Sequence, residues 1–218
     1  MLHVMPYIAM GFAVLNVEYR VAPEAKAPAA VQDARCALHW VYDNAARLGF
    51  DTTRVIATGH SAGAHLALMT GLLSEEDGLD TLCPGSHEPN VAAIVNWFGI
   101  TDVADVLEGP NREAWAEEWI GTDPGRERLV RHLSPLTHVD GQLPAILTIH
   151  GDRDETVPHQ HAVRLHDALE LAGAPNELLT IEGVGHGGLS EEQLRTAYAT
   201  MRDFLERHGI YQPVAVVD

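Results

Sequence analysis

The stretch TGHSAGAHLA, residues 58–67, decides the fold of this chain. It places a G-x-S-x-G pattern between a short β-branched run, residues 54–60, and a segment of helical composition that follows Ser61. A serine in this strand–turn–helix setting is typical of a nucleophile held on a sharp, strained turn. We expect glycine at Gly59 and Gly63 because a side chain at either position would collide with the neighbouring strand or helix. The pattern therefore predicts Ser61 as a nucleophile at the end of a strand.

Outward from this turn, apolar runs of strand length alternate with longer helical patterns. Five runs predict strands, at residues 11–20, 54–60, 91–99, 143–151 and 177–183. Spacing and composition predict the main helices at residues 28–48, 62–73, 159–173 and 190–208. Strands that alternate with helices of this length indicate a parallel sheet with helices on both faces. The predicted fold class is therefore α/β, a three-layer sandwich with a mostly parallel sheet flanked by helices.

Length and composition are those of one globular domain. A chain of 218 residues can bury a sizeable core, and its 46% hydrophobic and 21% charged residues are ordinary for such a domain. Residues 1–218 are expected to form one domain with a small helical insertion at about 102–139, where no strand period occurs. Trp115, Trp119 and Ile120 can pack this insertion.

The net charge of −17 argues against nucleic acid or an anionic membrane as a partner, because both are bound through clusters of Lys and Arg. No apolar run approaches the roughly 18 residues of a membrane span, and no signal-peptide pattern opens the sequence. Cys36 and Cys83 are expected to be free thiols, because two well-separated cysteines form neither a disulfide framework nor a zinc site. A cytoplasmic location is the expectation that follows.

Three loops, each directly after a predicted strand, contain the candidate catalytic residues. Ser61 follows the first of these strands, an acidic loop with Asp152, Asp154 and Glu155 follows the second, and His186 lies between glycines after the third. Ligands bind at the carboxyl ends of the strands in open parallel sheets, so these loops should converge. A histidine can take and return a proton near neutral pH, and a carboxylate can orient it. The three loops together predict a Ser–Asp–His triad, with the carboxylate left open among the three acidic residues.

The remaining histidines have simpler interpretations. His159, His161 and His166 cluster at a helix start, but they lack the spacing of a metal-binding motif and are expected to be surface or capping residues. His60 is expected to pack beside the pocket, and His65 to belong to the helix after Ser61. No metal ion and no cofactor is expected.

Taken together, the motifs give the chain a resemblance to a known family. It resembles the α/β-hydrolase carboxylesterases, in the branch of hormone-sensitive-lipase-like, feruloyl and acetyl-xylan esterase-like, and kynurenine-formamidase-like enzymes. The matching motifs, spread over the chain, are VEYRVAPEAKAPAAVQDA (17–34), GHSAGAHLA (59–67), SPLTHV (134–139), HGDRDETVP (150–158) and GVGHGG (183–188). In this family the triad Asp stands just before x-x-V-P, so the resemblance implies Asp154 as the orienting residue, with Ser61 as nucleophile and His186 as base.

Three further residues complete the predicted site. The N–H of Ala62 is expected to supply one oxyanion donor. His60 and Trp97 are expected to contact the substrate.

The chain departs from the family pattern at one point. These esterases have an HGGG-type loop ahead of the strand that corresponds to residues 11–20, and this chain has HGG only at 186–188. The lack of this loop and of the strand that carries it has three alternative explanations. The sequence is a truncated or mis-started version of a longer gene product; the segment 11–20 slides into place beside 54–60; or a partner chain fills the place of the missing strand. An oxyanion hole without that loop should not be assumed to give full activity.

The leading functional prediction is a serine carboxylesterase that hydrolyses short-chain acyl or aryl esters, with a small-molecule ester as its ligand. One alternative is an arylformamidase of the same fold. A second alternative is a catalytically weak or non-catalytic binding protein without a complete oxyanion hole. A homo-oligomer is a possible assembly.

Overall fold

The computed structural model describes residues 2–85, 87–108 and 111–213. Four parallel strands form its sheet: β1 (Ile56–His60), β2 (Ala93–Trp97), β3 (Ala145–Gly151) and β4 (Asn176–Ile181). Their spatial order is their order along the chain, β1-β2-β3-β4, and every neighbouring pair is parallel. The crossovers between them contain helices, as parallel pairing requires.

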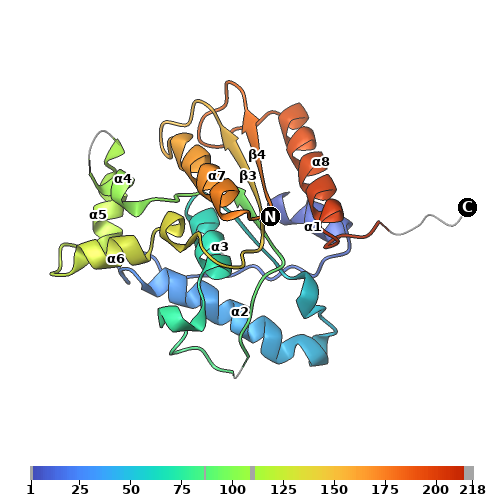
Figure 1. The fold of residues 1–218 in the computed structure, drawn as a ribbon, viewed down its shortest axis with the longest axis horizontal. Helices are drawn as coiled ribbons and strands as arrows, with labels where there is room; N and C mark the ends of the chain where they lie inside the picture. The colour runs from blue at the N-terminus through green and yellow to red at the C-terminus, as the bar shows by residue number, and fades with distance from the viewer. Residues whose placement is uncertain (1, 86, 109–110, 214–218) are drawn as a thin grey trace, which may run out of the picture.

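The helices lie on both faces of this sheet (Figure 1). The longer helices are α2 (Ala29–Leu48), α3 (Ala62–Leu72), α7 (Gln160–Ala172) and α8 (Glu191–Arg207). The short helix α1 (Met5–Ala9) lies on the same side as α8. Short 3₁₀ turns occur at Leu2–Val4, Thr52–Arg54, Glu75–Asp77 and Pro135–His138. The three-layer α/β sandwich predicted from the sequence is confirmed.

The core follows the period-two alternation of the strands. Val95 on β2 and Leu147 on β3 point to the face covered by α1 and α8, where they pack with Phe204. Ile94 and Ile146, their neighbours in sequence, point to the opposite face and pack with residues of α2, α3 and α7. All residues of β2 and β3 are buried, so both faces of the sheet are covered.

Between β2 and β3 the chain forms a group of small helices: α4 (Val103–Leu107), α5 (Ala114–Ile120) and α6 (Arg126–His132). They lie at one side of the molecule, left of the sheet in Figure 1. Val106, Ile120 and Val130 bury their side chains in one cluster with residues of α2 and α3. No helix among the described residues combines the length and the apolar run needed to cross a membrane.

The strand predicted at residues 11–20 is wrong. This segment has no strand assignment, and among the described residues β1 is an edge strand that pairs with β2 alone. The explanation in which the segment slides into place beside 54–60 is therefore also contradicted. Val14, Leu15 and Val21 are exposed. The physical reason is that an apolar run becomes a strand only where another strand pairs its backbone, and this run pairs with no described strand.

The expectation of two free thiols is also wrong. Cys36 on α2 and Cys83 in the loop before β2 form a disulfide across a sequence separation of 47. A buried ion pair holds that loop against α2: Arg35 Nε donates to Asp80 Oδ1 at 2.8 Å, and His39 Nε2 lies 3.1 Å from Asp80 Oδ2. This contact brings Cys83 next to Cys36, which sequence spacing alone does not reveal.

Candidate active site

The three predicted loops converge at one edge of the sheet. Ser61 directly follows β1, Asp154 lies three residues after β3, and His186 lies in the loop after β4. Because all four strands are parallel, their carboxyl ends meet at this edge. The edge therefore gathers the side chains that the sequence singled out.

The turn at Ser61 is strained and depends on one glycine. Ser61 has φ 54° and ψ −119°, a conformation that side-chain-bearing residues rarely adopt. A Cβ at Gly59 would lie 2.3 Å from the backbone C and O atoms of Gly63, so β1 and α3 can approach only with glycine there. The expectation for Gly63 itself is wrong, because a Cβ at that position meets nothing within 4 Å. It is the backbone of Gly63, rather than a missing side chain, that fills the space beside Gly59.

A second close approach joins the other two loops. A Cβ at Gly151, the last residue of β3, would lie 2.2 Å from the carbonyl oxygen of Val184. The backbone N–H of Arg153 donates to the same carbonyl at 2.9 Å. The loop with Asp154 is thereby held against the loop with His186.

The three side chains form a continuous hydrogen-bonded chain. The hydroxyl of Ser61 lies 2.8 Å from Nε2 of His186, and Nδ1 of His186 lies 2.8 Å from Oδ2 of Asp154. The His186 side chain is 23% exposed and that of Asp154 is fully buried. The arrangement can take a proton from the serine hydroxyl and stabilise the resulting imidazolium.

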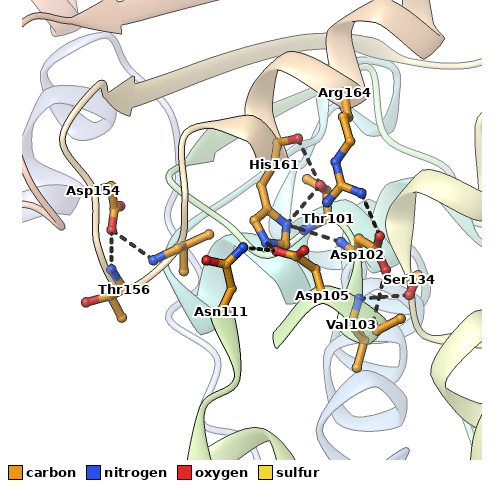
Figure 2. Close-up of polar contacts among 12 residues, drawn as sticks. Thr101, Asp102, Val103, Asp105, Asn111, Ser134, Asp154, Thr156, His161 and Arg164 are labelled. Atoms are coloured by element: carbon orange, nitrogen blue, oxygen red, sulfur yellow. Dashed lines mark hydrogen bonds and ion pairs between the residues drawn. The ribbon is translucent and has the colours of Figure 1, made fainter. Parts of the chain in front are cut away.

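Asp154 is held as an ionised acceptor. Its Oδ1 accepts the backbone N–H groups of Thr156 at 2.9 Å and Val157 at 2.8 Å (Figure 2). Burial alone would raise the pKa of Asp154, but hydrogen bonds from His150, Val157 and His186 outweigh it and lower the pKa to about 2. The other two acidic candidates do not contact His186: Asp152 accepts the Gly183 N–H at 2.6 Å, and Glu155 is exposed.

Ala62 and His60 flank the serine. Ala62 is the first residue of α3, whose first backbone hydrogen bonds run from Ala64 and His65 to Ser61, so the Ala62 N–H lies ahead of them at the positive end of the helix. The His60 ring stacks on Trp97 with centroids 5.0 Å apart. Burial, with a smaller effect of His3, lowers the pKa of His60 to about 4. Trp97 is only 1% exposed, which contradicts the expectation that it contacts the substrate; its ring packs against the His60 ring instead.

Sequence reasoning missed two residues that contact members of the triad. Phe98, which follows β2, has φ 45°, and its ring lies edge-on to the His186 ring with centroids 4.9 Å apart. His150 on β3 has Nε2 at 3.2 Å from Oδ2 of Asp154. Both stand inside apolar strand runs, where the sequence indicated only core packing. The aromatic and imidazole side chains at the carboxyl ends of those strands were the available signal.

His161 is not the surface or capping residue expected. Its side chain is fully buried, and its Nδ1 accepts the backbone N–H groups of Thr101 at 3.1 Å and Asp102 at 3.3 Å. Nε2 lies 3.1 Å from Oδ2 of Asp105, and Arg164 donates to Asp102 at 2.8 Å, so this network ties α4 to α7 (Figure 2). His166 is also buried, with Nδ1 at 2.7 Å from Oδ1 of Asn176. His159 is the partly exposed member, with Nε2 at 3.0 Å from the hydroxyl of Thr180.

Two other features lie away from this edge. His39, Asp80 and Cys83 have ligand atoms within 4.8 Å of one another, but the Cys83 sulfur is bonded to Cys36. A cleft of about 670 Å³ lies at the amino ends of the strands, and Ala92, Ala145 and Pro175 are among its lining residues. The cleft contains none of the three triad candidates and lies at the opposite end of the sheet.

Comparisons with known proteins match this chain to two family models and to curated esterases. The BD-FAE family model matches residues 2–169, and a model described as TAP-like protein matches residues 127–212. Esterase LipC of Mycobacterium tuberculosis is 29% identical over 185 residues, which are 82% of this chain and 46% of LipC. The arylesterase of Saccharolobus solfataricus is 44% identical over 66 residues, which are 30% of this chain and 22% of that protein. The chain thus spans less than half the length of these curated relatives.

The solved structures that resemble this chain also include esterases. A truncated form of a carbohydrate esterase from gut microbiota has a TM-score of 0.77 and 32% identity, and the match covers 93% of this chain and 76% of that one. Esterase 2 of Thermogutta terrifontis with bound propionate has a TM-score of 0.74 and 28% identity, and the match covers 91% of this chain and 72% of that one. An acetyl ester-xyloside bifunctional hydrolase from Caldicellulosiruptor lactoaceticus has a TM-score of 0.84 at 24% identity, which shows the shared fold; the match covers 97% of this chain and 77% of that one.

Proposed function

Because the chain belongs to the BD-FAE family of α/β hydrolases, we propose that it is a serine carboxylesterase that acts on short acyl or aryl esters through Ser61. The single observation that supports this most is the hydrogen-bonded chain from Ser61 through His186 to Asp154, with both links at 2.8 Å. A nucleophile within hydrogen-bond reach of a base, itself oriented by a third group, is the arrangement that activates a serine hydroxyl.

The proposed reaction has two steps. His186 Nε2 takes the proton of the Ser61 hydroxyl while Oγ attacks the ester carbonyl carbon, and the protonated His186 then gives this proton to the departing alcohol. The product of this step is an ester between the acyl group and Ser61. In the second step His186 takes a proton from water, the resulting hydroxide attacks the acyl carbon, and the proton returns to Ser61 as the acid leaves.

Asp154 and Ala62 have supporting roles in this proposal. The buried Asp154 carboxylate keeps the proton of neutral His186 on Nδ1, so that Nε2 faces the serine, and it stabilises the imidazolium formed in each step. The Ala62 N–H, at the positive end of α3, donates to the oxyanion of the tetrahedral intermediate. His60, beside Ser61 and held by Trp97, forms part of the wall that contacts the substrate.

The proposed ligand is a small neutral ester, and no cofactor takes part in the proposed steps. The similar proteins include a carbohydrate esterase and an arylesterase, so carbohydrate esters and aryl esters are the two substrate classes to compare first. The Cys36–Cys83 disulfide favours an oxidising compartment over the cytoplasm as the place of action, because such bonds are rare in a reducing cytosol.

Hydrolysis of p-nitrophenyl acetate by the purified chain tests the proposal. We expect steady turnover by the parent protein and loss of turnover in a folded Ser61→Ala variant. A matched control is Ser190→Ala, which removes a hydroxyl that caps α8 and lies outside the site. Equal turnover by the parent and Ser61→Ala would contradict the proposal.

A further inference from the structure

His150 occupies an unusual position for an imidazole. It is the second-to-last residue of β3, four residues before Asp154, and it is only 1% exposed. Its Nε2 lies 2.8 Å from the carbonyl oxygen of Val157 and 3.2 Å from Oδ2 of Asp154. Nε2 of this buried imidazole therefore lies close to both ends of the segment 154–157.

The partners of Nε2 fix the position of its proton. A carbonyl oxygen can only accept a hydrogen bond, so the contact with Val157 requires the proton on Nε2. Oδ2 of Asp154 lies 3.2 Å from the same nitrogen. Nδ1 of His150 is buried and has no hydrogen-bond partner among the described residues. His150 is thus arranged as a donor toward the carboxylate.

The Asp154 carboxylate has an asymmetric set of donors. Its Oδ1 accepts two backbone N–H groups, from Thr156 and Val157. Its Oδ2 accepts the Nδ1–H of His186 at 2.8 Å and lies 3.2 Å from Nε2 of His150. Rotation of the carboxylate away from His186 would therefore break contacts on both oxygens.

We propose that His150 is a positioning residue for the esterase reaction: its Nε2–H holds Oδ2 of Asp154 in line with Nδ1 of His186. This inference rests on the proposed function. It adds the imidazole of His150 to the groups that hold the Asp154 carboxylate. His150 does not contact Ser61 and acts through Asp154. The lowered pKa of Asp154, to which the His150 hydrogen bond contributes, agrees with this role.

The rings around His150 limit how it can move. The ring of His159 lies perpendicular to it with centroids 5.5 Å apart, and the ring of Phe98 lies edge-on at 6.4 Å. The space around His150 therefore fits a side chain of about the size of histidine, so a test substitution should retain most of the histidine volume.

Two variants of similar length separate the hydrogen bond from the packing. His150→Gln retains a donor near the position of Nε2, whereas His150→Met fills a similar space without a donor. We expect His150→Met to lower kcat on p-nitrophenyl acetate by about 10 to 100-fold, since small displacements of a triad member cost rates of that order, with KM within about twofold of the parent. We expect His150→Gln to recover most of the loss. His166→Met, at a buried histidine on α7 that lies outside the site, is the matched control and should retain the parent kcat.

Two kinetic outcomes would overturn the proposal: a folded His150→Met with the parent kcat, or equal losses of kcat in His150→Met and His150→Gln. If His150→Met does not fold, ¹⁵N NMR of histidine-labelled parent protein decides the question. The proposal requires the proton of His150 on Nε2, and a proton on Nδ1 alone would contradict it. This readout needs no turnover, so it separates failure of the positioning role from failure of the esterase assignment.

Discussion

Nδ1 of His186 lies 2.8 Å from Oδ2 of Asp154, although 32 residues of sequence and the whole of α7 and β4 separate them. The parallel sheet makes this contact possible, because it returns the chain to the same edge after every helix. Gly151 allows the two loops to approach without a side chain between them.

Asp154→Asn should keep the fold but remove most of the activity. The amide cannot stabilise an imidazolium and can donate to His186, which favours the wrong tautomer; the same change in a well-studied serine protease lowers kcat about 10⁴-fold. The measurement is kcat on p-nitrophenyl acetate. Glu155→Gln removes the same charge one residue away, on an exposed side chain, and should leave kcat close to the parent value. A similar loss in both variants would show that local charge, rather than the contact with His186, matters.

Gly59→Ala should destabilise the fold and Gly63→Ala should not, although both glycines belong to the same motif. A methyl group at position 59 would strike the backbone of residue 63 at 2.3 Å, so we expect Gly59→Ala to lower the free energy of unfolding by about 3 kcal/mol. Position 63 is helical with open space around its Cβ, so Gly63→Ala should be neutral or stabilising by up to about 1 kcal/mol. Urea unfolding of both variants checks this. Equal destabilisation would contradict the packing described for the turn.

Reduction of the Cys36–Cys83 disulfide should destabilise the chain. The bond closes a loop with a sequence separation of 47, and for loops of this size the chain-entropy model gives about 4 kcal/mol. Unfolding by urea with and without a dithiol reductant measures the difference. The Cys36→Ser/Cys83→Ser double variant is the control and should not respond to the reductant. Two free thiols titrated in the unreduced, denatured protein would show that the bond is absent.

Buried histidines should make the fold sensitive to mild acid. Burial lowers the pKa of His60 and of His65 to about 4, below the ordinary value of 6.5 that applies in the unfolded chain. Between these values the unfolded chain binds protons that the folded chain does not, so stability should fall as the pH falls from about 6.5 to about 4. Urea midpoints across this range check the sign. His65→Gln should reduce the slope, and a midpoint that stays constant in the parent protein would contradict the prediction.

The sequence was sufficient for the parts of the fold and site that depend on local pattern. The runs at β1 to β4, the long helices and the three loops at the strand ends all follow from periodicity and turn residues. The choice of Asp154 over Asp152 came from the family motif, and the contact of its carboxylate with His186 agrees with it.

Features that depend on contacts distant in sequence could not be predicted. Residues 11–20 have the composition of a strand, but composition does not show whether a neighbouring strand is there to pair with them. Cys83 meets Cys36 because Asp80 is bound by Arg35, a buried contact across 45 residues. His161 and His150 resemble ordinary histidines in the sequence, and their burial and partners become evident only in three dimensions.

The most direct test of the central claim is covalent labelling of the folded chain with a fluorophosphonate, followed by peptide mass spectrometry. A serine activated by His186 should attack the phosphorus and retain the label, so the adduct is expected on the peptide with Ser61 and should be absent in Ser61→Ala. An unlabelled folded protein, or a label that stays in Ser61→Ala, would contradict the assignment of Ser61 as the nucleophile.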